Sequence, residues 1–175
     1  MARLYHFSEE AGIERFAPRP PLAHPEQEPL VWAVDEWHSP HYFLPRDCPR
    51  VCFWARPESS PSDVGRMLGL AARAVVIERA WLPAVREAVL YRYEFDADGF
   101  DLVDETAGYY ACRHAVRPVR VQRLENPPAL FPRHGVDFRA VDDLIALHLA
   151  IVASTLAFSS IRLRNAGGER AEGRR

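Results

Sequence analysis

The sequence predicts an α+β domain with a mixed, largely antiparallel sheet, short helices and a long C-terminal helix. Strand-like and helical segments follow one another irregularly, without the strict alternation of a doubly wound α/β protein. Fifteen prolines divide the chain into short elements. A length of 175 residues is that of one domain, which we place at residues 1–164, with a disordered tail at 165–175.

The first half of the chain reads as strands separated by proline-broken loops. Ser39 and Pro40 form a helix-start signal, a capping hydroxyl followed by proline at the first helical position, and Pro45 ends this short helix. The segment 17–29, APRPPLAHPEQEP, holds too many prolines for a helix and predicts an extended loop. The predicted strands are 4–7 (LYHF), 30–34 (LVWAV) and 50–55 (RVCFWA), and a loop with a short helix follows at 57–70.

The second half predicts more strands and two helices. Trp81, Val85 and Val89 have helical spacing. Residues 90–95, LYRYEF, alternate as a half-buried strand does. A long helix is expected from about residue 138 to 161. The remaining predicted strands are 74–78 (AVVIE), 108–112 (GYYAC) and 115–124.

Composition excludes several classes of partner and chemistry. The formal net charge is -2, with 22 basic and 24 acidic residues, which argues against a nucleic-acid-binding surface. Three cysteines without repeated spacing make no disulfide framework, so we expect a cytoplasmic protein. The uncharged segment 144–161 contains His148 and several hydroxyl side chains, and we expect a buried helix there rather than a membrane span.

Long segments resemble a family of uncharacterised bacterial proteins. The resemblance rests on LYHFSEEAGIERFAPR, PLVWAVDEWHSPHYFLPRDCPRV, GYYAC followed by AVRPVRV, and FSSIRLRNA. It covers nearly the whole chain and implies no particular activity.

A second, distant resemblance concerns layout. LYHFS, LVWAVDEWHSPHYF, LYRYEFDADGFD and YYACRHAVRPVRV are similar, in order, to the elements of small ADP-ribosyltransferases of the rifampin-modifying type. The resemblance implies NAD as a cofactor, with His6 on the adenosine ribose and Trp32 in the place of the second strand's aromatic residue. It implies a catalytic carboxylate at Asp96, Asp98 or Asp101, without choosing among the three. Phe7-Ser8 stands where those enzymes have Gly-Thr, which departs from the close backbone approach that glycine permits.

Further residues are candidates for the same ligand site. Adjacent strand residues point to opposite faces, so of Tyr109 and Tyr110 one is expected in the core and one against a ligand. Arg46 and Arg50 flank Asp47 between two prolines, as an anion-binding loop or a rigid turn would. The complete set of predicted cofactor-binding residues is His6, Trp32, Tyr42, Arg46, Tyr109 and Tyr110.

Two other chemistries are weighed against simpler interpretations. Asp35, His38 and His41 are spaced three residues apart. They could be the ligands of a metal site with two histidines and one carboxylate. The simpler interpretation is that Asp35 is a turn residue and the two histidines are exposed. We expect no metal. Cys48 beside Asp47 is a candidate nucleophile only if a base lies near it.

Three functions follow from these patterns: a nucleotide-binding ADP-ribosyltransferase, a non-enzymatic ligand-binding or interaction module on the same fold, and a metal-dependent enzyme as the least favoured. If the protein is an ADP-ribosyltransferase, His6 should lie at the floor of a cleft, because an imidazole inside a strand needs a polar partner. Trp32 or a tyrosine of 108–112 should lie nearby, together with an arginine such as Arg46.

Overall fold

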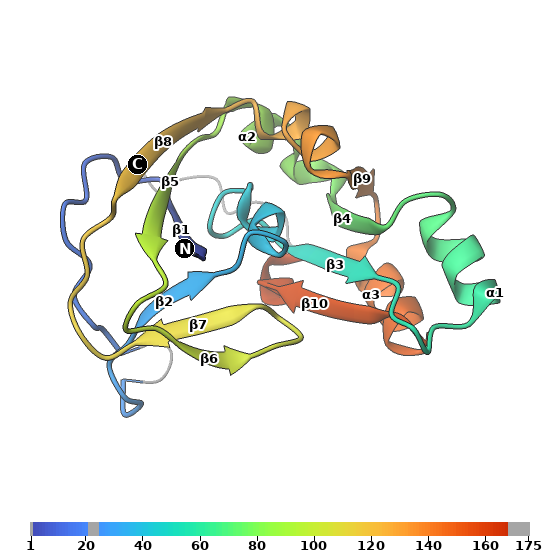
Figure 1. The fold of residues 1–175 in the computed structure, drawn as a ribbon. Helices are drawn as coiled ribbons and strands as arrows, with labels where there is room; N and C mark the ends of the chain where they lie inside the picture. Colours follow the sequence, from blue (N-terminus) through green and yellow to red (C-terminus); the bar gives the residue numbers. More distant parts are fainter. Residues whose placement is uncertain (1, 21–24, 168–175) are drawn as a thin grey trace. The chain divides into compact units, whose positions relative to one another are not determined.

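The computed structural model describes residues 2–20 and 25–167. It has two β-sheets and short helices, which confirms the α+β class and the mostly antiparallel pairing (Figure 1). Internal contacts divide the chain into two compact units. Unit 1 contains the residues up to Phe43 and Ala88–Glu125, and unit 2 contains Leu44–Glu87 and the residues from Asn126 onward.

Unit 1 is built on a six-stranded sheet with the order β6-β7-β2-β1-β5-β8. Every neighbouring pair in it is antiparallel. Val116, inside the predicted strand 115–124, makes an isolated bridge to Phe16, and regular pairing begins only after Pro118, which lacks a backbone donor. The elements of unit 1 are β1 (Arg3–Ser8), β2 (Val31–Val34), η1 (Ser39–Tyr42), β5 (Val89–Asp96), β6 (Asp101–Asp104), β7 (Tyr109–Cys112) and β8 (Arg120–Glu125).

The two faces of this sheet differ in composition. On the core face, Leu4, Ala33, Tyr93 and Phe95 form a buried cluster, and Phe16 from the loop after β1 packs against it. The aromatic face carries the alternate residues, including Tyr5, Phe7, Trp32 and Tyr109, because paired residues share a face and neighbours along a strand do not.

The short helix η1 begins differently from the prediction. His38 occupies the N-cap position and Ser39 is already inside the helix. The Ser39 hydroxyl donates to the carbonyl of Glu36 at 2.9 Å, so it does not cap the helix. Pro40 still stands near the first helical position, as expected.

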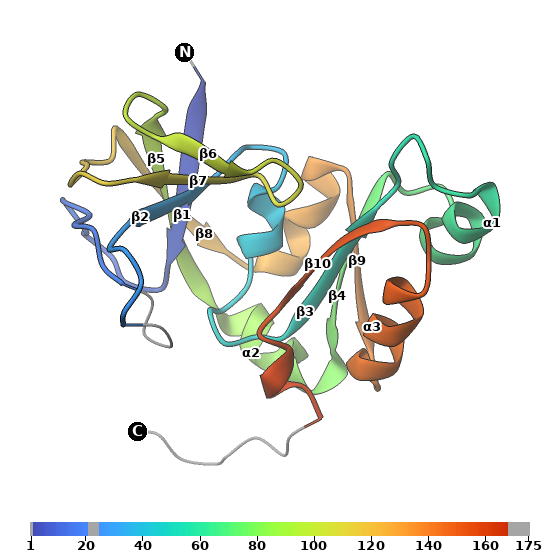
Figure 2. The same ribbon diagram turned by 90° about the horizontal axis from the view of Figure 1, so that it is seen from below.

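Unit 2 is built on a four-stranded sheet with the order β10-β3-β4-β9, in which only β4 and β9 are parallel. Helix α3 packs on this sheet, as Figure 2 shows, and Leu144 and Ile151 bury their side chains in its core with Val51, Phe53 and Val76. The elements are β3 (Arg50–Trp54), α1 (Pro61–Asp63), η2 (Val64–Leu68), β4 (Arg73–Glu78), η3 (Arg79–Trp81), α2 (Leu82–Glu87), η4 (Pro127–Ala129), η5 (Phe131–His134), β9 (Val136–Val141), α3 (Leu144–Val152), β10 (Ala157–Ile161) and η6 (Leu163–Asn165).

The predicted long C-terminal helix is wrong. Residues 136–141 form β9, only Leu144–Val152 is helical, and Ala157–Ile161 forms β10 along β3. The apolar run fits both a helix and a buried strand, and the pairing partner β3 decides between them. Across residues 2–20 and 25–167, no helix has the length and apolar character that crossing a bilayer requires. Of the predicted tail, Asn165–Gly167 are described, with Asn165 in η6, and residues 168–175 lie outside the described part.

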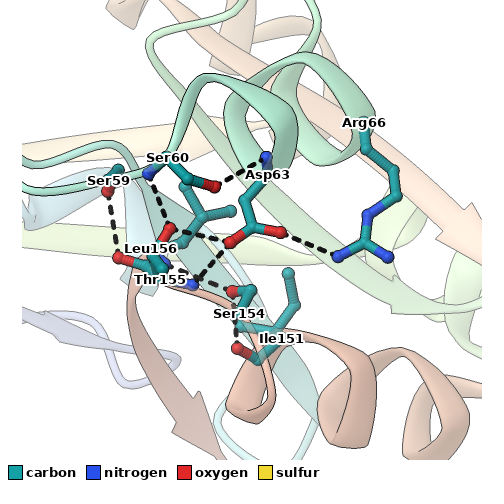
Figure 3. Close-up of polar contacts among 8 residues, drawn as sticks. All are labelled: Ser59, Ser60, Asp63, Arg66, Ile151, Ser154, Thr155 and Leu156. Carbon is teal, nitrogen blue, oxygen red and sulfur yellow. Dashed lines mark hydrogen bonds and ion pairs between the residues drawn. The ribbon is translucent and has the colours of Figure 1, made fainter.

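A polar network fixes the turn that ends α3 (Figure 3). The Asp63 carboxylate accepts hydrogen bonds from the backbone N–H of Thr155 at 2.9 Å and from its hydroxyl at 2.7 Å. Ser60 caps α1 by accepting from the backbone of Asp63 at 3.2 Å, and its own N–H donates to the Thr155 hydroxyl at 2.8 Å. Arg66 donates to the other carboxylate oxygen at 2.8 Å. All of these hydrogen bonds join backbone and side-chain groups of this chain. We therefore infer that the network stabilises the folded state.

Because of this network, we expect the stability of the folded state to fall at acid pH. Hydrogen bonds from the backbone and then the hydroxyl of Thr155 lower the pKa of Asp63 from 3.8 to about 2. A depressed carboxyl pKa stabilises the folded state above the unfolded pKa, and that contribution is lost as pH falls from about 4 to about 2.

In urea unfolding curves measured from neutral pH down to about pH 2, Asp63→Asn should lower stability at neutral pH and flatten the acid-dependent loss. Asp142→Asn is the control, because this carboxylate also pairs with an arginine but is 83% exposed. Equal pH profiles for Asp63→Asn and the unsubstituted protein would contradict the assignment.

Candidate functional site

Four aromatic side chains meet on the aromatic face of unit 1, and we name them the aromatic corner: Phe7, Trp32, Tyr42 and Tyr109. The hydroxyls of Tyr42 and Tyr109 are 2.6 Å apart, the ring of Phe7 stacks on Tyr42 with centroids at 6.1 Å, and Trp32 meets Tyr109 edge-on at 6.3 Å. The antiparallel register brings Trp32 of β2 next to β7, and η1 brings Tyr42 over the sheet. Trp32 remains 37% exposed, so part of an indole face is accessible.

A carboxylate–histidine pair lies next to this corner, in the turn after β2. The Nδ1 atom of His38 is 2.9 Å from both carboxylate oxygens of Asp35, and the backbone N–H of His38 donates to Asp35 Oδ1 at 2.7 Å. Burial alone would raise the pKa of Asp35, but the hydrogen bonds from His38 outweigh burial and hold the pKa below its ordinary value. An ionised carboxylate requires a proton on Nδ1, which fixes the tautomer of a neutral His38.

Gly108 lies directly against the side chains of Asp35 and His38. Its φ is +66°, and a Cβ built on it would lie 2.1 Å from His38 Nδ1 and 2.5 Å from Asp35 Oδ2. Its carbonyl also accepts the backbone N–H of Asp35 at 3.0 Å. Glycine is therefore required here both for its conformation and for the space that it leaves.

Five of the six predicted ligand residues lie in unit 1, divided between the two faces of its sheet, whereas Arg46 lies in unit 2. Trp32, Tyr42 and Tyr109 come together on the aromatic face, whereas Tyr110 packs against the buried cluster of the core face. His6 also belongs to the core face, because it pairs in register with Tyr93. Sequence reasoning predicted that Tyr109 and Tyr110 point apart, and the register agrees.

His6 is half-buried, with Nδ1 2.9 Å from the carbonyl oxygen of Trp32 and its ring 4.9 Å from that of Phe16. Thus Trp32 reaches His6 through its backbone, while its indole lies on the other face. A surface depression of about 360 Å³ lies along the loop after β1, and His6 is not one of its lining residues. These are Gly12, Ile13, Glu14, Arg117, Pro118 and Val121.

None of the three candidate catalytic carboxylates contacts the aromatic corner. Asp96 ends β5 and pairs with Arg3, and Asp98 is exposed in the turn that follows. Asp101 lies in the same row of the sheet as Trp32, but its carboxylate is 74% exposed and 2.9 Å from the guanidinium of Arg113. Asp35 is brought close to the aromatic corner by Gly108, which precedes Tyr109, and Asp104 pairs in register with Tyr109 itself.

Metal and thiol chemistry find little support among the described residues. No group of three or more His, Cys, Asp or Glu side chains in residues 2–20 and 25–167 is arranged to hold a metal ion. His38 directs Nδ1 to Asp35, and the rings of His38 and His41 have centroids 5.5 Å apart. Cys48 is fully buried, and burial raises the pKa of the Cys52 thiol to about 12, so neither is presented as an accessible thiolate.

The fold and the site define a two-sheet α+β protein whose first unit joins exposed aromatic rings to a pair made of the half-buried Asp35 and the buried His38. The chain belongs to DUF6886, a family of unknown function, and the family model matches residues 5–166. No curated protein and no solved structure matches the chain. The match agrees with the resemblance to an uncharacterised family, and the resemblance to ADP-ribosyltransferases has no such support.

Sequence reasoning weighed Asp35 and His38 only as metal ligands and overlooked Gly108. Two signals pointed to them: an Asp and a His three residues apart directly after a buried strand, and a glycine directly before Tyr109. The sequence contains no sign that the two segments meet, because β2 and β7 are far apart in the chain.

Proposed function

We propose that unit 1 binds a small molecule with a flat ring and hydroxyl groups, as a nucleotide has, between the aromatic corner and the Asp35–His38 pair. The observation that carries the proposal is the exposure of two tryptophans. Trp32 (37%) belongs to the aromatic corner, and Trp37 (42%) has its ring centroid 4.6 Å from that of the buried His38. Exposed aromatic rings beside a few placed polar groups are typical of ligand sites.

NAD and ADP-ribose are the first ligands to test. The reaction that we propose for the site is ADP-ribosyl transfer. In that reaction the bond between nicotinamide and ribose C1′ breaks, and nicotinamide leaves with the bonding electrons. An acceptor then bonds to C1′ and loses its proton. Asp35, whose pKa is held low by His38, supplies a negative charge that stabilises the positive ribose.

Binding without turnover is the second candidate. Asp96 and Asp101, two of the carboxylates that the resemblance made candidates for catalysis, are engaged by Arg3 and Arg113 instead. A module that binds a nucleotide without cleaving it fits this arrangement.

We also infer a reducing compartment such as the cytoplasm. Cys48, Cys52 and Cys112 are buried as thiols in the described structure.

Titration with NAD and ADP-ribose tests the binding proposal. A ligand at 100 times its Kd stabilises the folded state by about 2.7 kcal/mol, which raises Tm by roughly 5–10 °C for a chain of this size. Trp32→Ala should remove the shift. Phe158→Ala is the matched control, since Phe158 is also 37% exposed but lies in unit 2.

Nicotinamide release separates the two candidates. A transferase or glycohydrolase releases nicotinamide from NAD, and Asp35→Asn should abolish the release while ADP-ribose still binds. Binding without release supports the non-enzymatic module. The absence of any Tm shift with either ligand at millimolar concentration would exclude both nucleotide candidates.

A further inference from the structure

Two arginine-rich segments of unit 2 that are far apart in the sequence are adjacent in the fold. Strands β3 and β10 pair antiparallel, with Arg50 opposite Ile161. The end of β10 therefore lies at the beginning of β3, which places Arg162 beside the turn that contains Arg46. Arg164 follows in η6.

Hydrogen bonds to backbone carbonyls hold these segments together. Arg162 Nε donates to the carbonyl of Arg46 at 3.4 Å, and the Asn165 side chain donates to the carbonyl of Asp47 at 2.7 Å. Arg50, which is 2% exposed, donates through Nη1 to the carbonyls of Pro45 at 3.1 Å and Cys48 at 2.7 Å. For Arg162, the carbonyl oxygen of Arg46 positions the guanidinium but leaves its positive charge in place.

Among the described residues, the four arginines outnumber the two carboxylates close to them, Asp47 and Glu78. The buried Glu78 follows Ile77, the partner of Arg50 in β4, and accepts the backbone N–H of Gly167 at 2.7 Å. Asp47 is the carboxylate recorded against Arg162, at 4.0 Å, and its side chain is 72% exposed, so solvent screens much of its effect. Burial, and then the charges of Arg164, Arg46 and Arg50, lower the pKa of Arg162, while Asp47 acts in the opposite direction. The lowered pKa of Arg162 reflects repulsion from the neighbouring arginines, and a bound anion would relieve that repulsion.

The backbone at Arg162 adds an independent observation. Its φ is +57°, and among the described residues only Asn126 shares a positive φ without being glycine. The left-handed conformation disfavours a long side chain. Residues held in unfavourable backbone conformations are often found where a side chain must be aimed at a ligand.

We propose that Arg46, Arg50, Arg162 and Arg164 form a binding site for a phosphate group. Planar guanidinium groups match the oxygen atoms of phosphate in pairs, and the buried Arg50 gives the site a fixed base. The site lies within unit 2 and does not depend on the ligand proposed for unit 1.

The test is a titration with inorganic phosphate, in chloride buffers of matched ionic strength, followed by calorimetry or by NMR. Arg162→Gly should weaken phosphate binding by about 10- to 100-fold, the loss of one or more charge-assisted hydrogen bonds. Glycine suits a φ of +57°, so this variant should keep its fold. Arg133→Ala, which removes an equal charge from another exposed position of unit 2, should leave the Kd unchanged.

Asp47→Asn should change the phosphate affinity in the opposite direction from Arg162→Gly. It removes the carboxylate nearest Arg162 and should tighten phosphate binding several-fold. Weaker binding in Asp47→Asn, equal losses in Arg162→Gly and Arg133→Ala, or no saturable binding below about 10 mM would each overturn the proposal.

Discussion

Gly108→Ala is expected to destabilise unit 1 by about 2–5 kcal/mol, the sum of a left-handed backbone cost and of overpacking. The new Cβ would lie 2.1 Å from His38 Nδ1, so the Asp35–His38 pair must separate or the turn must move. Urea unfolding followed by tryptophan fluorescence measures the loss. Ligand binding at the aromatic corner should weaken in the same variant, because Tyr109 directly follows Gly108.

Gly12→Ala is the matched control for this prediction. Gly12 also lies in unit 1 with a positive φ, +73°, but a Cβ there meets no atom within 4 Å. Only the backbone cost of about 1–2 kcal/mol should remain. If both variants lose the same stability, crowding at the pair contributes nothing and the close fit around Gly108 is refuted.

Phe16→Ala should cost about 3 kcal/mol, as removal of a packed phenylalanine does. Phe16 anchors the loop after β1, with ring centroids 5.0 Å from Tyr93, 5.1 Å from Phe95 and 4.9 Å from His6. Its loss leaves a cavity over the core face and loosens the cover of His6. Thermal and urea unfolding give the magnitude.

Two further measurements assign this effect to the core face. Phe16→Leu keeps most of the volume and should cost less than about 1.5 kcal/mol. Below the unfolding temperature, Phe16→Ala should bind a ligand of the aromatic corner with unchanged Kd, because Phe16 and Trp32 lie on opposite faces of the sheet. A large loss of that binding would mean that the ligand contacts the core face and His6.

Period-two patterns and local signals predicted much of the secondary structure. The alternating residues LYRYEF predicted the strand that is β5 in the structure. The same local reasoning placed Tyr109 and Tyr110 on opposite faces of the sheet. These features depend on residues close together in the chain, so they can be derived without tertiary contacts.

The C-terminal segment shows where local reasoning stops. Between Leu144 and Ile161 the sequence is uncharged throughout, and nothing local chooses between one long helix and a helix followed by a strand. The choice is made at Thr155, which is held by Asp63, a residue 92 positions earlier. Strand β3 then supplies the pairing partner for β10.

The sequence by itself determined the α+β class, most strands of unit 1 and the opposition of neighbouring side chains, because these follow from spacing along one segment. Only the tertiary structure decided which face of the sheet is covered, which aromatic rings meet and which carboxylate lies beside them. It also brought Arg162 next to Arg46 through the pairing of β3 with β10. Both candidate sites join segments distant in the chain, and such contacts depend on strand register and loop packing, which a single sequence does not record.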